Sequence, residues 1–292
     1  MKPLLIPLAL YLLLGSVFIP EGTAADARDL VRRVLDRNDG TTEIARVRLT
    51  TCAVTKKNRK IVCTSAPRIK VMDMVRKDYG PREKDHRTVT ILLKPEGEKG
   101  IGFLQYDYEE KNRDTDQWLY FSSLGKVKRI VSGSDNEPKT GSFFGSELSY
   151  EDMEKRHIED YTYTLKGNET YAGRNCAVVV SVPTTERAPK SNYSKTMDWI
   201  DTERDLVLKS ILFNRQGKKS KRIYFKDVQK IDGIFVPLQM VVLNLKESRM
   251  TVMAYEKIRL NTPVDDDFLT QRTLTDGAFR ESRLKQYQAA YE

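Results

Sequence analysis

The sequence predicts a mainly β fold (α+β) built around one antiparallel sheet. Between about residues 40 and 260, apolar residues alternate with polar ones, which is typical of strands that bury one face. Short turns rich in Gly, Pro, Asn and Asp separate these stretches. No stretch resembles the helical crossover that parallel strands require. Since no linker and no change of period interrupts the pattern, we expect residues 26–292 to form a single domain.

Alternating apolar residues mark the clearest strands. They are Val47/Leu49, Val89/Ile91/Leu93, Trp118/Tyr120, Val178/Val180/Val182, Ile211/Phe213, Ile223/Phe225 and Val252/Ala254. The turns between them include Tyr79-Gly80-Pro81, Arg215-Gln216-Gly217-Lys218 and Ile231-Asp232-Gly233. Turns of this length join neighbouring strands, so we expect a meander.

Three segments show helical rather than strand signals. Asp26 is a candidate N-cap for an amphipathic helix that presents Ala27, Leu30, Val31, Val34 and Leu35. Ser149 and Asp152 form a capping-box pattern, which predicts a short helix as far as about His157. Phe279, Leu284, Tyr287 and Tyr291 recur at helical spacing and predict a terminal helix, with a frayed polar tail as the alternative.

Residues 1–25 have the pattern of a secretory signal peptide. A positive start, Met1-Lys2, precedes an apolar run from Leu4 to Ile19, and cleavage would follow Ala24 or Ala25. The alternative is an uncleaved anchor, but the run is shorter than the ~20 residues that cross a bilayer. We therefore expect an exported, soluble mature protein.

Composition and charge narrow the class of partner. The 292 residues are 39% hydrophobic and 31% charged, a globular balance, and 50 basic against 41 acidic residues give a net charge of +9. Such a charge favours anionic partners. The basic residues are spread from Arg28 to Lys285 and no nucleic-acid-reading motif is present, so we expect no nucleic-acid partner.

The three cysteines leave two pairing states open. Cys52 and Cys63 flank the polar stretch Lys56–Lys60, where they would face each other across a hairpin and form a disulfide. The alternative is that both, with Cys176, are buried thiols that act as small hydrophobic side chains.

Catalytic and metal-binding patterns are scarce. The chain has only two histidines, His86 and His157, and no paired C-x-x-C or H-E-x-x-H motif. The Gly141–Ser146 loop lacks the lysine of a phosphate-binding loop, and Asp265-Asp266-Asp267 lacks the spacing of a calcium loop. We expect no catalytic residue, no metal and no cofactor, and keep an envelope hydrolase as the least favoured hypothesis.

The most specific stretch of sequence lies between Asp116 and Asp152. It contains Trp118-Leu119-Tyr120, then Val127-Lys128-Arg129-Ile130, then the segment Gly141-Ser142-Phe143-Phe144-Gly145-Ser146 that leads to Tyr150-Glu151-Asp152. This stretch resembles the signature of the outer-membrane lipoprotein-sorting protein family, the LolA-like proteins associated with RND-type (MMPL) exporters. The resemblance extends to Gly100–Leu104, Gly173–Cys176, Trp199–Asp201 and Phe268–Leu274 and covers most of residues 40–275. Residues 52–88 fit poorly, and the tail after Asp276 has no counterpart.

The resemblance implies a strongly curved antiparallel sheet, an incomplete barrel with lid helices over an apolar cavity. It further implies a periplasmic carrier of lipid, of lipoprotein acyl chains or of a similar hydrophobic cargo, working with an RND/MMPL-type transporter and touching membrane surfaces transiently. The alternative is a non-catalytic interaction module of an envelope complex with a filled core and no ligand.

Candidate site residues follow from the matched motifs. The expected cavity-lining residues are Phe103, Trp118, Tyr120, Phe143, Phe144 and Leu148, for each of which core packing is the competing interpretation. Lys126, Lys128 and Arg129 are expected to contact anionic headgroups or a partner, with a solvated strand face as the alternative. Tyr150, Glu151 and Asp152 are expected to serve architecture.

Overall fold

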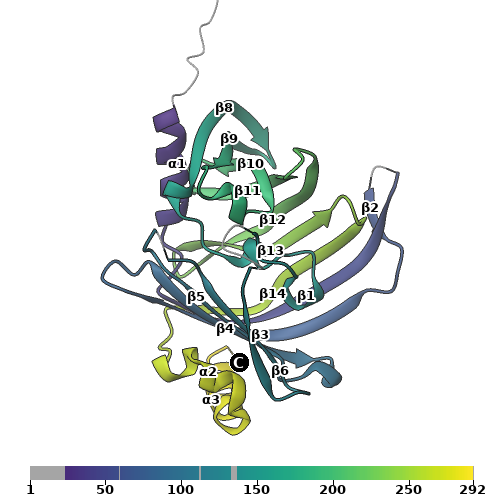
Figure 1. The fold of residues 1–292 in the computed structure, drawn as a ribbon, viewed down its shortest axis with the longest axis vertical. Coiled ribbons are helices and arrows are strands. Elements are labelled where there is room, and N and C mark those ends of the chain that lie inside the picture. Colours follow the sequence, from purple (N-terminus) through teal and green to yellow (C-terminus); the bar gives the residue numbers. More distant parts are fainter. Residues whose placement is uncertain (1–23, 59, 112, 133–136, 292) are drawn as a thin grey trace, which may run out of the picture.

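The computed structural model describes residues 24–58, 60–111, 113–132 and 137–291 (Figure 1). The expected signal peptide lies outside these residues except for its last two positions. Of the helices that the structure describes, none has the length and apolar character needed to cross a membrane.

All the strands belong to one antiparallel sheet, which confirms the expected fold class. Along the sheet the order is β7-β6-β5-β4-β3-β1-β14-β13-β12-β11-β10-β9-β8, with β2 paired only to β1. The strands are β1 Thr42–Lys57, β2 Lys60–Cys63, β3 Arg68–Tyr79, β4 Asp85–Lys94, β5 Gly102–Asp107, β6 Asp116–Phe121, β7 Lys126–Ile130, β8 Tyr161–Tyr171, β9 Arg174–Pro183, β10 Tyr193–Asp201, β11 Leu206–Asn214, β12 Lys219–Ile231, β13 Ile234–Asn244 and β14 Arg249–Leu260. Most neighbours in the sheet are also neighbours in sequence, as the short turns predict.

The sheet is strongly curved and stays open (Figure 1). Strand β1 pairs with both β3 and β14, so the first and last parts of the meander meet at its middle. Strands β7 and β8 form the two edges and are not paired with each other. The sheet is therefore an incomplete barrel with a concave and a convex face.

Helix α1, Ala24–Asp36, covers the concave face near the β8 edge. It begins two residues before the expected cap at Asp26. Its buried residues Ala27, Leu30 and Val31 pack with Tyr161 and Val179 of β8 and β9, as the helical spacing of its apolar residues predicts.

The terminal helix that the spacing predicts is present as α3, Gly277–Ala289, preceded by the short helix α2, Gln271–Thr275. Together they cover the convex face of β1 and β3–β6, where Phe268, Leu274 and Leu284 pack onto Ile91 and Leu104.

One buried carboxylate attaches the end of this layer to the sheet. Asp73 of β3, which is 2% exposed, accepts hydrogen bonds from Arg46 Nε (3.0 Å), Gln288 Nε2 (2.6 Å) and the Tyr291 hydroxyl (2.9 Å). The C-terminal residues therefore form a packed layer, and the alternative of a frayed polar tail is wrong.

The expected helix from Ser149 to about His157 is wrong. Ser149 and Asp152 do form the reciprocal bonds of a capping box, Ser149 N to Asp152 Oδ2 (2.7 Å) and Asp152 N to Ser149 Oγ (3.3 Å). They enclose a single 3₁₀ turn, Glu151–Met153, after which Glu154 is extended. Side-chain contacts with the sheet hold the following residues in this extended path, and they outweigh the local preference.

Cys52 and Cys63 are joined by a disulfide that ties β1 to β2, and Cys176 is a buried free thiol. The bond closes the base of a hairpin that extends beyond the rest of the sheet (Figure 1).

Gly102 of β5 allows the close approach of α2, which gives a test of the convex layer. A Cβ there would lie 2.7 Å from Leu274 Cδ2 and 3.0 Å from Ile91 Cδ1. We expect Gly102→Ala to lower the free energy of unfolding by about 1–3 kcal/mol, because a filled core resists added volume. Gly97→Ala is the control, since its Cβ would meet nothing within 4 Å, and it should change stability by less than about 0.5 kcal/mol. Urea unfolding measures both, and equal effects would contradict the packing described.

Candidate functional site

The signature loop, residues 141–152, is folded into the concave face of the sheet. It is closed by a bridge between Ser142 and Ser149 and by a hydrogen bond from Phe143 N to Leu148 O (2.9 Å). Its aromatic rings gather around Phe103 of β5, with centroid distances of 5.3 Å to Phe143, 6.4 Å to Phe144 and 6.0 Å to Tyr150. The loop therefore fills the middle of the half-barrel.

Two backbone features make this folding possible. Gly141 lies against the ring of Tyr150, where an added Cβ would be 2.7 Å from Cε2. Phe144 has a φ of +48°, a strained conformation for a bulky residue that surrounding contacts must hold. Its ring supplies those contacts by packing at 4.5 Å from Phe143.

The structure separates the six residues expected to line a cavity. Phe143, Phe144 and Leu148 are buried in the core with Phe103. Trp118 and Tyr120 point to the opposite, convex face, under the C-terminal helices. There Trp118 contacts Tyr106, whose hydroxyl donates to Leu269 O (2.7 Å). The pairing of β6 with β5 explains this separation. Trp118 lies opposite Leu104, which faces the convex side, whereas Leu119 lies opposite Phe103, which faces the concave side.

The three expected headgroup contacts are also divided between two faces. Lys126 and Lys128 of edge strand β7 are exposed and lie on the same face as each other. Arg129 lies on the other face and forms an ion pair with Asp116. The three cations do not form one patch.

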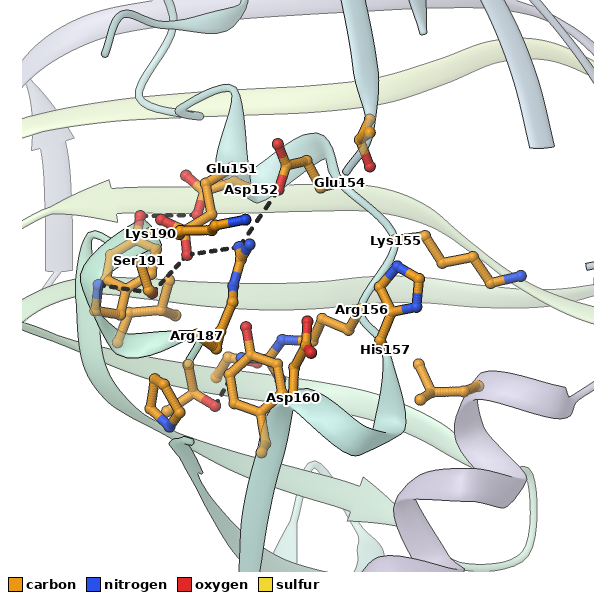
Figure 2. A pocket seen from close by; sticks show the side chains of 18 of the residues that line it. Glu151, Asp152, Glu154, Lys155, Arg156, His157, Asp160, Arg187, Lys190 and Ser191 are labelled. Atoms are coloured by element: carbon orange, nitrogen blue, oxygen red, sulfur yellow. Dashed lines mark hydrogen bonds and ion pairs between the residues drawn. The ribbon is translucent and has the colours of Figure 1, made fainter. Parts of the chain in front are cut away.

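The described residues line two cavities on the concave face beside the signature loop. The first has a volume of about 280 Å³ and lies between α1 and strands β10–β12 (Figure 2). Its apolar wall comes from the inward residues Val31, Val34, Leu35, Leu212, Ile223 and Phe225. The second has a volume of about 220 Å³, lies over β3–β5 and is lined by Met74, Met153 and Phe103 together with polar side chains. Of the six expected residues, only Phe103 lines either of these two cavities.

A single extended segment separates the two cavities. Residues 153–157, which we name the strap, follow the signature loop, and both cavities are lined by its Glu154 and Lys155. Met153 lines only the second cavity and His157 only the first. The strap therefore crosses the concave face between them.

Side chains, not strand pairing, hold the strap. Gln105 Nε2 donates to Met153 O (2.6 Å), and Lys155 N donates to Asp107 Oδ1 (3.1 Å). On the other side, Arg156 Nη2 donates to Thr196 Oγ1 of β10 (2.9 Å). The strap is not part of any strand, so side chains hold it in place. Ion pairs of Glu154 with Lys139 (2.7 Å) and of Arg156 with Asp198 (3.5 Å) add to these hydrogen bonds.

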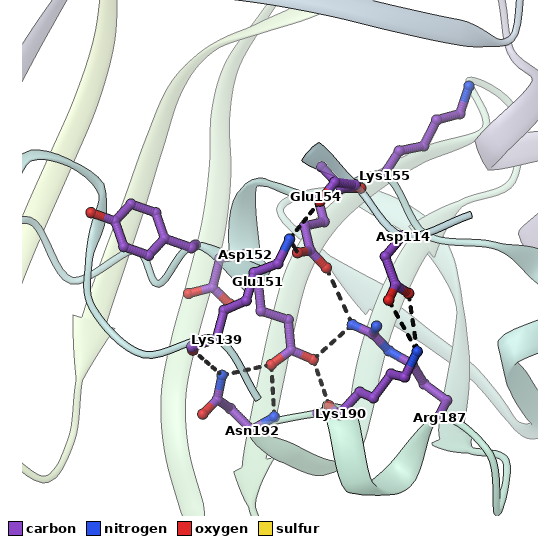
Figure 3. A network of polar contacts seen from close by, with 12 residues as sticks. Asp114, Lys139, Glu151, Asp152, Glu154, Lys155, Arg187, Lys190 and Asn192 are labelled. Carbon is purple, nitrogen blue, oxygen red and sulfur yellow. Dashed lines mark hydrogen bonds and ion pairs between the residues drawn. The ribbon is translucent and has the colours of Figure 1, made fainter. Parts of the chain in front are cut away.

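The strap begins at a network of buried charges centred on Glu151 (Figure 3). The Glu151 carboxylate, whose side chain is 8% exposed, accepts from Ser191 Oγ (2.5 Å), Asn192 N (2.7 Å) and Asn192 Nδ2 (2.8 Å). Arg187 Nη2 lies 3.3 Å from the same carboxylate and 3.4 Å from Glu154. Lys139 also pairs with Glu154 (2.7 Å), whose pKa is raised by burial.

Asp152 joins the loop to the second half of the sheet. It accepts from the Tyr193 hydroxyl (2.7 Å) on β10 and from Lys221 Nζ (2.5 Å) on β12. Glu151 and Asp152 therefore fix the loop to separate elements, which is an architectural role.

A polar cluster lies at the second cavity. Lys155 Nζ lies 2.6 Å from His86 Nε2, and Arg76 Nη1 lies 3.4 Å from His86 Nδ1. Burial lowers the pKa of His86 to about 3, and the charges of Lys155 and Arg76 add to this effect, so the imidazole is neutral at physiological pH. Burial also raises the pKa of the nearby Asp78 to about 6.

The sequence did not identify the residues that line the first cavity as site residues. It did predict the helix and the strands to which they belong. Ile223 and Phe225 show the expected alternation, and Val31, Val34 and Leu35 the expected helical spacing. The pattern marks an inward face but does not distinguish a cavity wall from a filled core. Among the described residues, no group of three or more His, Cys, Asp or Glu side chains is placed to hold a metal ion.

Comparison with known proteins places this geometry in a family. A family model for an uncharacterized protein matches residues 84–276, more than half of the 292 residues. The fold is shared with an outer membrane lipoprotein-sorting protein domain from Vibrio parahaemolyticus (TM-score 0.73, 23% identity, 87% of this chain and 100% of that chain covered). The chain belongs to the family that this model describes, and its fold is LolA-like.

Two further solved structures have the LolA-like fold of this chain. A DUF1329 family protein from Desulfovibrio piger has a TM-score of 0.75 and 22% identity, covering 86% of this chain and 98% of its own. A LolA superfamily protein from Nitrosomonas europaea has a TM-score of 0.60 and 17% identity, covering 84% and 97%. No curated protein matches the chain in sequence.

Removing the Glu151 carboxylate tests the network that holds the loop. We expect Glu151→Ala to cost about 2–4 kcal/mol of unfolding free energy, because the largely buried Arg187 and the donors of Ser191 and Asn192 lose their acceptor. Glu203→Ala is the matched control, since Glu203 pairs with Arg174 but its side chain is 72% exposed. It should cost less than about 1 kcal/mol in the same denaturant titration. Equal losses would show that the Glu151 network adds no stability.

The lowered pKa of His86 predicts a defined pH dependence. A group whose pKa falls on folding stabilises the protein at high pH, and that stability is lost as pH falls from 6.5 to about 3. The stability difference between the protein and His86→Asn should therefore grow as pH rises through this window and stay constant above pH 6.5. Denaturation at several pH values measures it, and NMR should show no charging of the His86 ring between about pH 5 and 8. A difference independent of pH would contradict the assignment.

Proposed function

We propose that the protein is a periplasmic carrier that shields lipid, lipoprotein acyl chains or a similar hydrophobic cargo during transport to the outer membrane. The observation that carries this proposal is the pair of cavities on the concave face, both of which are lined by the strap. The proposal includes export by the predicted signal peptide, cleavage after Ala24 or Ala25, cooperation with an RND/MMPL-type exporter, and no catalytic step.

The walls of the first cavity suit an acyl chain. Val34 and Leu35 of α1 line it together with Leu212 and Phe225 of the sheet. Its lining also holds charged side chains, of which Lys190 is partly exposed and Arg187 is largely buried (Figure 2). Each CH₂ removed from water is worth ~0.8 kcal/mol, so a long chain needs on the order of 10 kcal/mol of shielding. An apolar wall supplies this, and partly exposed charged side chains such as Lys190 remain in contact with water.

The volumes support a role for the strap as the moving part. Pockets for small molecules measure about 300–1,000 Å³, and each of the two cavities is smaller than this range. The two together reach it. Because the strap is held by side-chain hydrogen bonds and ion pairs and not by strand pairing, it can be displaced without separating two strands of the sheet. In this proposal the strap moves when an acyl chain enters, and the two cavities then form one.

A second candidate is an interaction module of an envelope complex that binds no cargo. The packing of Phe143, Phe144 and Leu148 into the middle of the half-barrel favours it, since this part of the interior is filled. The two candidates differ in whether the remaining cavities take up lipid.

Native mass spectrometry of protein purified from its own envelope without detergent, followed by solvent extraction, tests the carrier. We expect a stoichiometric hydrophobic molecule. Val34→Asp and Phe225→Asp should each lower its occupancy by about tenfold or more, because a carboxylate in the apolar wall must be desolvated beside the cargo.

Val252→Asp is the matched control. Val252 is half-buried and lines neither cavity. It alternates with Met253, which faces the concave core, so it lies on the other face. This variant should keep its cargo, with circular dichroism confirming that all three variants fold. Protein that is empty at source and takes up no lipid from vesicles would favour the interaction module.

A further inference from the structure

The hairpin β1–β2 projects beyond the rest of the sheet (Figure 1). Its described tip residues are basic and exposed. Its tip carries Lys56, Lys57 and Lys60, all exposed, and the apolar Ile61, which is 43% exposed. Strand β2 pairs only with β1, and the disulfide between Cys52 and Cys63 ties its base. The disulfide therefore fixes the base of the hairpin, and in the described structure no further strand pairs with the outer edge of β2.

Two neighbouring turns continue the same surface. Val54 N donates to Ser248 O (2.8 Å), which places the hairpin base beside the β13–β14 turn. Leu245 N donates to Ser220 O (2.9 Å), which places that turn beside the start of β12. The three segments therefore form one continuous end of the sheet.

The residues at this end are basic and exposed. We name as the basic rim the lysines Lys56, Lys57, Lys60, Lys218, Lys219 and Lys246 together with the exposed Ile61 and Leu245. Lys246 has an ion pair with Glu247 at 3.6 Å, with the two side chains 85% and 54% exposed, so it is weakly compensated. Within the described parts of the chain, the other five lysines form no ion pair.

Several lysines elsewhere in the chain are compensated by acidic partners. Lys139 and Lys221 pair with acidic residues inside the interior, and Lys77 and Lys84 pair with Asp266 and Asp36 at the surface. The grouping of the lysines of the rim does not stabilise the fold, because like charges repel one another. An external anionic surface accounts for their grouping.

We propose that the basic rim is the surface by which the protein docks on an anionic phospholipid membrane. The lysines would lie at the phosphates, and Ile61 and Leu245 would enter the headgroup region. Each lysine near such a surface attracts it independently, so six act together without a specific binding pocket. Exposed aliphatic side chains next to the lysines add affinity that a purely electrostatic contact lacks. This inference gives the proposed carrier its membrane step and rests on that function, but docking is measured separately from cargo.

The test is flotation of the purified protein with vesicles. One set contains phosphatidylethanolamine with about 30 mol% phosphatidylglycerol, which gives the vesicle surface the negative potential that attracts clustered lysines, and the other contains phosphatidylcholine alone. We expect binding to the first set, weakening as salt rises, and at least about tenfold less binding to the second. The triple variant K56E/K57E/K60E should lower binding to the anionic vesicles by about tenfold or more.

The matched control is K166E/K226E/K257E, which changes the net charge equally. These three lysines are exposed, belong to strands β8, β12 and β14 away from the rim, and have no ion pair among the described residues. This control should keep most of the binding. Ile61→Ser, which alters no charge, should reduce binding while leaving its salt dependence unchanged.

Three results would overturn the proposal: no binding to anionic vesicles, equal binding to both vesicle types, or equal losses in the triple variant and its control. If the lysines serve an acidic protein partner, the first of these results is expected. Cargo extracted from K56E/K57E/K60E separates the two proposals. A variant that retains cargo but does not float has lost docking alone, whereas a protein that floats but carries nothing contradicts the carrier function alone.

Discussion

The packing of Phe143, Phe144 and Tyr150 around Phe103 is the contact on which the interior depends. A strongly curved open sheet leaves a concave face too wide for its own side chains to fill, and the signature loop fills its middle. The strained backbone of Phe144 persists because these rings hold it. The loop therefore determines where space remains, which is at its two sides.

Buried charge then sets how the loop and the strap are held. Glu151 and Asp152 are held by donors from several elements, namely the segment at Ser191 and the strands β10 and β12. The strap that follows is held by side-chain hydrogen bonds and ion pairs and not by strand pairing. A segment held in this way can change position without breaking the hydrogen-bond ladder of the sheet. The separate layer of α2 and α3 stabilises the convex face without entering this region.

Alternation explains both the success and the failure of site prediction. It identified β6 correctly, yet Trp118 and Tyr120 face the C-terminal helices rather than the interior. Successive side chains of a strand point to opposite faces of the sheet, and both faces are apolar where other elements pack on both. In β6, Gln117 and Leu119 lie on one face and Trp118 and Tyr120 on the other. The two large aromatic residues were the natural candidates for a cavity wall, but they lie on the convex face. Only the pairing of β6 with β5 resolves which face is concave.

Local chemistry determined much of the protein from the sequence alone. The strands, the meander, the two terminal helices and the family follow from spacing, turn residues and the motif between Asp116 and Asp152, since each depends on near neighbours in the chain. The tertiary structure alone decided that the capping box at Ser149 opens one turn instead of a helix, that the signature aromatics fill the core, and that two cavities flank the strap. It also grouped the lysines of three separate turns at one end. These features arise from contacts between residues far apart in sequence, which no local pattern specifies.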